Sequence, residues 1–261
     1  MPLNMKVTIL GCGSSNGVPL IGGSWGACDP DNPKNRRRRP SILVEWDDSI
    51  ILVDTSPDLR GQLIDANVQR IDAVLFTHVH ADHIHGIDDL RPVHRLTGKV
   101  IEAFGEASVI DAVVARFSYL FMGVTPDDAM YRPVLNPNAV DGPFNYAGHE
   151  ITPFPQDHGI CPSTGFRFGP FAYSTDVVQL GDNAFVALKG VDTWVVDCLR
   201  VGPEHPTHAH LERTLEWIGR VRPRRAILTH MNHQTDYDAI AALLPDGVEP
   251  AYDGMQMIVQ S

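Results

Sequence analysis

The sequence predicts an α/β protein in which sheets and helices pack in layers. Three features lead to this prediction: short apolar segments bounded by Gly, Pro and Asp, longer helical segments between them, and a repeated Thr-His pair that follows an apolar segment. The pairs stand at 77–78 and 229–230, which indicates two similar halves that face each other. In layered α/β folds, loops at the strand ends carry function on a rigid scaffold. We therefore expect the functional site at the strand ends.

The expected strands are short segments that are apolar or alternate in polarity, and turn residues bound them. In chain order they are 6–10, 41–45, 50–53, 73–76, 100–104, 151–154, 165–168, 171–174, 193–196, 226–228 and 255–259. Gly169 and Pro170 predict a tight turn between two of these strands.

The expected helices follow apolar periodicity and capping signals. Ser56 as N-cap and Pro57 at the first helical position predict the start of the first helix. In chain order the helices are 57–66, 107–119, 207–221 and 237–244. The segment 122–147 is expected as an irregular surface excursion because of its Pro and Asn content. The loop 11–40 is rich in Gly, Ser, Asn and Pro, and a loop of this length is usually functional or disordered; we favour a functional loop.

Composition limits the class of protein. The 261 residues are 43% hydrophobic and 20% charged, which is enough to bury a full core, so we expect one globular domain over 1–261. The net charge of −11 disfavours bulk binding to nucleic acid. The four cysteines form no CxxC pair, and no segment has the pattern of a signal peptide or membrane span. We expect a cytoplasmic protein without a membrane partner; a homodimer is one alternative for its oligomeric state.

Histidines cluster most strongly in His78-Val79-His80-Ala81-Asp82-His83. Three imidazoles and one carboxylate within six residues are the nitrogen and oxygen donors that Zn²⁺ takes. If the chain is extended at first, His78 and His80 point to the same side, and a following turn directs Asp82 and His83 to a neighbouring site. The alternative, a polar loop of unpaired histidines, accounts poorly for this density. The stretch therefore predicts two metal sites.

This stretch resembles the HxHxDH signature of the metallo-β-lactamase fold superfamily, and the resemblance spans nearly the whole chain. It implies a four-layer αββα sandwich that holds two divalent metal ions, with Zn²⁺ favoured and Mn²⁺ the alternative. One ion is expected on a trio of histidines, the other on two histidines and an aspartate, with a second aspartate shared by both. The implied ligands are His78, His80 and His158 for the first ion, Asp82, His83 and His230 for the second, and the bridging Asp176.

The same resemblance assigns roles to residues that do not bind metal. Asp54 ends an early strand and is expected to support the metal loop. His208 resembles the extra histidine of the superfamily's phosphodiesterases, where an imidazole can donate a proton to a departing alkoxide or bond a phosphoryl oxygen. His205 and His210 are alternatives for that role. Asp82, one of the implied metal ligands, is also expected to take part in catalysis. The remaining clustered histidines are expected to be structural: His85, His94, His149 and His233.

Two features of the loop 11–40 bear on the substrate. The segment 11–17 has the spacing GxGxxxG with no clear helix after it, which argues against a dinucleotide site. It resembles the GxGSxxGVP opening of the phosphodiesterase and tRNase Z branch, where the loop borders the active site. The dense basic run 34–39 suits a phosphate group, and we expect Arg37 and Arg39 to contact it; a solvated surface is the alternative.

The resemblance is strongest to PhnP-like cyclic phosphodiesterases. It implies a dinuclear metal-dependent phosphodiesterase in which metal-bound hydroxide attacks a small cyclic or nucleotide-like phosphodiester. A tRNase Z-like RNA-processing nuclease shares the metal pattern but needs an extended basic arm that the sequence lacks. A glyoxalase-II or lactonase-type hydrolase also shares the ligands. A non-catalytic protein that senses a nucleotide is the alternative outside enzymes.

Overall fold

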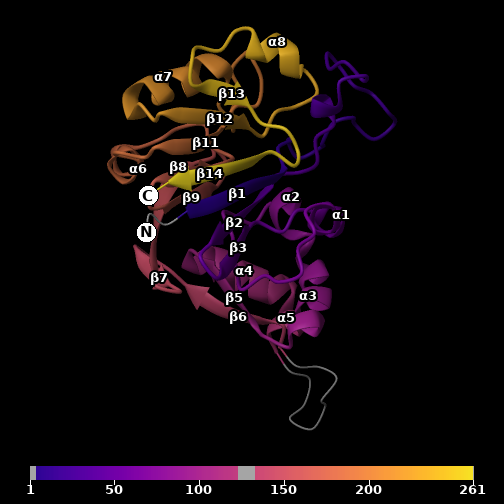
Figure 1. Cartoon of the computed structure of the whole chain (residues 1–261), viewed down its shortest axis with the longest axis vertical. Coiled ribbons are helices and arrows are strands. Elements are labelled where there is room, and N and C mark those ends of the chain that lie inside the picture. Colours follow the sequence, from indigo (N-terminus) through magenta and orange to yellow (C-terminus); the bar gives the residue numbers. More distant parts are fainter. Residues whose placement is uncertain (1–3, 123–132, 261) are drawn as a thin grey trace.

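The fold consists of two β-sheets packed face to face, with helices covering both outer sides (Figure 1). It is seen in a computed structural model that describes residues 4–122 and 133–260. The strand order of the first sheet is β14-β1-β2-β3-β4-β5-β6, and that of the second is β13-β12-β11-β10-β9-β8-β7. The expected four-layer αββα sandwich is therefore confirmed.

The first sheet contains β1 (Asn4–Gly11), β2 (Ser41–Trp46), β3 (Ser49–Val53), β4 (Ala73–Leu75), β5 (Ile101–Gly105), β6 (Leu135–Ala139) and β14 (Gln256–Gln260). The second sheet contains β7 (Phe144–Tyr146), β8 (His149–Asp157), β9 (Pro162–Phe168), β10 (Phe171–Ser174), β11 (Thr193–Asp197), β12 (Arg225–Thr229) and β13 (Val248–Pro250). Strands β1 and β14 pair antiparallel, which brings the two ends of the chain together.

Helices of the first half cover the first sheet, and helices of the second half cover the second sheet (Figure 1). The first group is α1 (Leu59–Asp65), α2 (Ala81–Ile84), α3 (Leu90–Thr97), α4 (Ala107–Arg116) and α5 (Ser118–Phe121). The second group is α6 (Asp182–Ala187), α7 (Leu211–Val221) and α8 (Tyr237–Ala241), and two 3-10 helices are η1 (Pro33–Asn35) and η2 (Ile87–Asp89). Among the described residues, no helix is both long and apolar enough to span a bilayer.

The expected strands are all present, with shifts at their ends, but the sequence missed several elements. Helices α3 and α6 and strands β6, β7 and β13 were not predicted, and β6 and β7 lie in the segment expected to be irregular. Of that segment, 123–132 lies outside the described residues. Two helices begin later in the chain than expected. Helix α1 begins at Leu59 and not at 57, because the Ser56 hydroxyl accepts a hydrogen bond from the Asp58 N–H and forms a turn there. Helix α7 begins at Leu211 and not at 207.

Alternating burial holds the layers together. Successive side chains of a strand face opposite sides of the sheet. In β3, Ile51 and Val53 belong to the core shared by both sheets, whereas Leu52 packs with the residues beneath the helices. In β4, Leu75 and Val74 divide in the same way. Because the central strands are buried on both faces, their ends form a rigid platform.

The two Thr-His pairs meet at this platform. Strands β4 and β12 lie in different sheets, and each is followed by its histidine, His78 or His230. The Nε2 atoms of His78 and His230 lie 3.7 Å and 3.2 Å from oxygens of the Asp176 carboxylate. The two halves of the chain therefore contribute to one site.

The loop between β1 and β2 packs along the segment that follows β12. Gly13 forms a parallel bridge with Met231, the residue after His230. Arg37 is 2% exposed, and its guanidinium donates to the carbonyl oxygens of Thr235 at 2.7 Å and Asn232 at 3.2 Å. The expectation that Arg37 holds a substrate phosphate is therefore wrong, because its N–H groups anchor the loop instead.

The rest of the basic run is engaged as well. The Arg39 guanidinium lies 3.0 Å from the Asp58 carboxylate, so an acidic neighbour balances its charge. Arg38 pairs with Asp65 in the same way. The structure thus gives no support to Arg39 as a phosphate contact, and most of the run serves to fix the loop.

Replacing Arg37 by Ala should destabilise the fold. The change leaves the Thr235 and Asn232 carbonyl groups buried without their donor, which costs about 2–5 kcal/mol of unfolding free energy. Urea unfolding measures the difference. Arg36→Ala is the matched control, because Arg36 is exposed and stacks over Trp25 at 5.2 Å, and it should cost less than about 1 kcal/mol. Equal stability of Arg37→Ala and the wild type would contradict the anchoring role.

Candidate metal centre

The residues expected to bind metal lie together where strands of both sheets end. They form two groups, and in each group one candidate ligand atom per residue lies within 4.8 Å of the others. The first group is His78, His80, His158 and Asp176, and the second is Asp82, His83, Asp176 and His230. The division between the groups is the one that the family resemblance implies, and Asp176 belongs to both.

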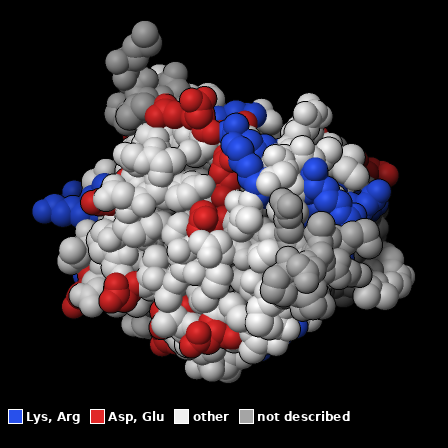
Figure 2. Space-filling view, turned by 90° about the horizontal axis from the view of Figure 1, so that it is seen from below, with Lys and Arg blue, Asp and Glu red and all other residues white. Residues whose placement is uncertain are grey.

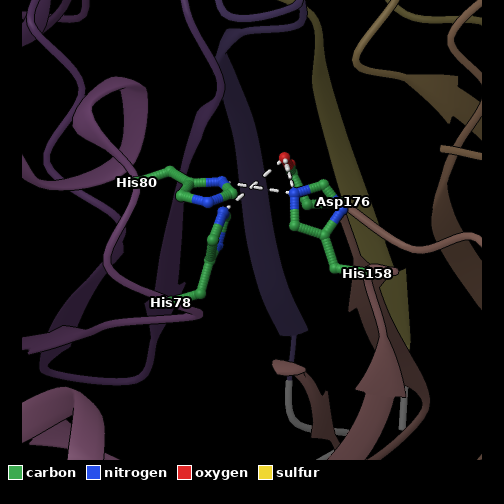
Figure 3. Close-up of side chains that lie close together, drawn as sticks. All are labelled: His78, His80, His158 and Asp176. Carbon is green, nitrogen blue, oxygen red and sulfur yellow. Dashed lines mark hydrogen bonds and ion pairs between the residues drawn. The ribbon is translucent and has the colours of Figure 1, made fainter. Parts of the chain in front are cut away.

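In the first group, histidines from the two halves of the chain point toward each other (Figure 3). His78 and His80 lie in the extended segment after β4, and His158 follows β8. The His158 Nε2 atom lies 3.2 Å from His80 Nδ1 and 3.5 Å from Asp176 Oδ2. His78 and His80 thus share a side, as the period of two in an extended chain predicts.

In the second group, the short helix α2 supplies two neighbouring side chains. Asp82 and His83 lie in its first turn, so the chain turns directly after His80. The His83 and His230 Nε2 atoms lie 3.1 Å and 3.2 Å from Asp176 Oδ1, and 3.3 Å and 3.6 Å from Asp82 Oδ2. Asp176 therefore turns one carboxylate oxygen to each group.

Four of the imidazoles are held by a contact at the ring nitrogen that faces away from the candidate metal position. When one ring nitrogen is bonded to a fixed partner, the other nitrogen is aimed at the metal position. The pairs are His83 Nδ1 with Asp54 Oδ2 at 2.6 Å, His158 Nδ1 with the Thr207 carbonyl at 2.6 Å, His78 Nδ1 with Thr77 Oγ1 at 3.0 Å, and His80 Nε2 with Cys161 Sγ at 3.6 Å. Asp54 also accepts from the Thr77 N–H at 2.8 Å, so it ties the metal loop to the end of β3.

Three residues of the site have a left-handed backbone. The φ angles of Asp54, Asp176 and His230 are 62°, 53° and 61°. Residues with side chains rarely adopt this conformation, which costs on the order of 1 kcal/mol or more each and persists where the surroundings over-determine it. Each of these residues lies one or two positions after a strand, and the left-handed conformation turns its side chain toward the site.

His208 lies over both groups. Its ring stacks on His230 with centroids 4.6 Å apart and lies 4.8 Å from the His158 ring. Its Nδ1 atom is 3.2 Å from Asp197 Oδ2, and its Nε2 atom is 4.0 Å from Asp176 Oδ2. The contact with the carboxylate places the proton on Nδ1 and leaves Nε2 facing the site.

The neighbouring histidines occupy different positions. The His205 ring lies 5.3 Å from that of His208, and its Nδ1 atom accepts a hydrogen bond from the Thr207 N–H at 3.3 Å. His210 is the N-cap residue of α7 and joins neither metal group. Of the three candidates, geometry favours His208.

Sequence reasoning missed two residues of the site. Asp197 is fully buried at the end of β11, where its carboxylate bonds His208 and the Val177 N–H. Its signal was an aspartate closing an apolar strand, the pattern that identified Asp54. Cys161, on the turn between β8 and β9, had no such signal, because its contact with His80 joins positions far apart in the chain.

The charges of the second group favour bound cations. Burial alone lowers the pKa of a histidine, but the Asp176 and Asp82 carboxylates overcome it and raise the pKa of His83 and that of His230, the latter to about 9. In the first group, burial dominates and lowers the pKa of His78, so this imidazole is neutral at pH 7, as a metal ligand must be.

The hydrogen-bond inventory also fits metal ions. Four buried ligand atoms, namely His78 Nε2, Asp82 Oδ2, His83 Nε2 and His230 Nε2, have no hydrogen-bond partner among the described residues. Buried polar atoms are rarely left in this state, and metal ions satisfy imidazole nitrogens and carboxylate oxygens arranged in this way. The residues present therefore fit a pair of divalent ions.

Comparison with known proteins identifies the family. The family model described as a beta-lactamase superfamily domain matches residues 50–231. The chain belongs to this superfamily, among the hydrolases with the metallo-β-lactamase fold. A solved diphosphatase of the PhnP family is 31% identical, with a TM-score of 0.90, and the match covers 100% of this chain and 99% of that one.

Two curated relatives match at lower coverage of their own length. An octanoyltransferase of Porphyromonas gingivalis is 31% identical over 261 residues, which is 98% of this chain and 52% of that protein. A ribonuclease Z of Bradyrhizobium diazoefficiens is 29% identical over 141 residues, which is 52% of this chain and 46% of that protein. The chain thus spans about half the length of these two relatives.

Asp54→Asn should weaken metal binding. The amide puts an N–H donor where the carboxylate accepts from His83, so the ring loses the partner that aims its Nε2 atom into the second group. We expect the affinity for Zn²⁺ to fall about 10- to 100-fold, measured by competition with a coloured chelator. The control is Asp72→Asn, because Asp72 lies at the opposite end of β4 and pairs with Arg70. Wild-type affinity in Asp54→Asn would contradict the supporting role.

Proposed function

We propose that this protein is a dinuclear metal-dependent hydrolase of small phosphodiesters, cyclic or nucleotide-like. The observation that carries the proposal is the position of His208, which lies above two candidate metal groups that share Asp176. The ligands proposed are His78, His80 and His158 for the first ion and Asp82, His83 and His230 for the second, with Zn²⁺ the favoured metal and Mn²⁺ the alternative. Such an arrangement suits a phosphoryl centre, which carries charge on several oxygens at once.

Two bound divalent ions supply an acidified water and neutralise the charge that develops on phosphorus oxygens. The chain's own residues hold this chemistry in place. Asp176 keeps the two groups adjacent through its two oxygens, and Asp54 fixes the loop that carries four of the ligands. Because Asp54 and Asp176 are buried, their carboxylates act at short range with little screening by water.

His208 is proposed to move a proton. Asp197 accepts a hydrogen bond from His208 Nδ1 and stabilises the positive charge that the ring acquires when Nε2 is protonated. The protonated Nε2 can donate to a leaving oxygen or bond a phosphoryl oxygen. The His208 side chain is 12% exposed, which allows it to recover a proton from solvent.

Cleavage of a diphosphate is the second candidate function. The PhnP-family relative that resembles this chain over its full length is a diphosphatase. Hydrolysis of a phosphoanhydride, like that of a diester, is an attack on phosphorus, but the oxygen that leaves is bonded to a second phosphorus instead of a carbon. The two metal groups and His208 would hold either substrate. The two reactions differ in the charge of the leaving group, which is an alcohol from a diester and a phosphate from a diphosphate.

Charge argues against a large RNA substrate. The chain has a net charge of −11, and on the face seen in Figure 2 the Lys and Arg side chains form separate groups beside acidic ones. Processing of RNA needs an extended basic surface that follows the backbone. A small phosphorylated substrate is therefore the better proposal, although a ribonuclease Z is among the relatives.

The test is a panel of substrates on Zn²⁺-loaded protein: bis(p-nitrophenyl) phosphate, p-nitrophenyl phosphate, ADP-ribose, a thioester and a lactone. We expect turnover of the diester, or of ADP-ribose if the second candidate holds, with little on the monoester. Asp176→Ala should abolish turnover. Turnover confined to the thioester or the lactone, or nucleotide binding without any turnover, would contradict the proposal.

The role of His208 is tested on the same panel. His208→Ala should lower kcat about 10²- to 10⁴-fold for a 2′,3′-cyclic nucleotide added to the panel, because its leaving alkoxide needs a proton donor, whereas p-nitrophenolate leaves without one. The metal content should stay as in the wild type, since His208 is not a proposed ligand. His85→Ala is the control, because His85 is exposed and its nearest aromatic neighbour is Phe117. Equal kcat in His208→Ala and the wild type would exclude this role.

A further inference from the structure

A basic side chain that the proposed function does not use is fixed beside the first metal group. Arg116 is the last residue of α4, and its exposed guanidinium donates from Nη1 to the Val79 carbonyl oxygen at 2.7 Å. Val79 stands between His78 and His80 in the chain, and both Val79 and His80 are partly exposed. The hydrogen bond therefore keeps a positive charge at the solvent-facing side of the metal loop.

Other arginines near the site are already occupied. Arg37 is buried against main-chain carbonyls, Arg39 is balanced by Asp58, and Arg200 donates to the carbonyl oxygens of residues 203 and 204. In Arg116, the bond to a single carbonyl uses one of the five N–H groups of a guanidinium. Among residues 4–122 and 133–260, the one contact found for the guanidinium is this hydrogen bond to the Val79 carbonyl oxygen. Because Arg116 is exposed, its remaining N–H groups are accessible to a ligand.

The chemistry of this group suits a phosphate. A guanidinium presents paired N–H donors that match two phosphate oxygens, and it stays charged at any physiological pH. Because the chain as a whole is strongly acidic, an anionic substrate is repelled at long range and needs a positive charge close to the site. Phe117, the next residue, is half-buried, with its ring packed against the core beneath the helices and 6.2 Å from that of His85.

We infer that Arg116 binds a second phosphate group of the substrate, the one that lies outside the two metal groups. It thereby favours substrates with two linked phosphates over diesters whose arms are uncharged. The inference rests on the proposed function, since it takes the first phosphate to lie at the metal groups. It makes Arg116 a residue of substrate specificity and leaves the hydrolytic step to the groups already described.

The test compares two substrates and three variants. Arg116→Gln removes the charge and keeps a polar side chain, Arg116→Lys keeps the charge, and Arg95→Gln removes the same charge from exposed Arg95 on α3. We expect Arg116→Gln to lower kcat/KM for ADP-ribose about tenfold more than kcat/KM for bis(p-nitrophenyl) phosphate. Arg116→Lys should recover part of this difference, and Arg95→Gln should show none. Equal loss on both substrates, which a purely structural role predicts, would overturn the inference.

Binding gives a readout that needs no turnover. Calorimetric titration of Zn²⁺-loaded protein with ADP and with AMP measures the preference for a second phosphate. We expect Arg116→Gln to weaken ADP binding about tenfold more than AMP binding. An unchanged preference for ADP over AMP would overturn the inference. Because this result does not depend on catalysis, it separates a failure of the inference from a failure of the proposed function.

Discussion

The buried carboxylate of Asp176 is the interaction on which the site depends. One of its oxygens faces His83 and His230, and the other faces His78 and His158. A charge in this position is costly unless cations or proton donors surround it closely. The histidines meet this need, and in doing so they bring the ends of both sheets to one point.

The sandwich provides the rigidity that such a site requires. Its central strands are buried on both faces, so the positions where they end are set by packing across the whole core. The left-handed backbone at Asp54, Asp176 and His230 is tolerated because these ends cannot relax. The loop between β1 and β2 adds to this frame, since the buried Arg37 ties it to the segment after His230. Stability and function are therefore linked at the same edge.

The sequence alone could predict those features of the site that depend on residues close together in the chain. His78, His80, Asp82 and His83 lie within six residues, so period and turn suffice to divide them between two groups. His158, Asp176 and His230 needed the resemblance to a family. The missed strands β6, β7 and β13 lie at sheet edges, where partial exposure relaxes the apolar pattern. The prediction that Arg37 contacts a phosphate was wrong because a basic run does not reveal hydrogen bonds to distant residues. The Arg37 guanidinium donates to a carbonyl oxygen 195 residues away in the chain.

The central claim is that two metal ions bind on either side of Asp176. The most direct measurement is anomalous diffraction from crystals of the Zn²⁺-loaded protein, recorded above and below the zinc absorption edge. We expect two anomalous peaks per chain, one beside His78, His80 and His158 and the other beside Asp82, His83 and His230. A single peak, or none at these residues, would contradict it.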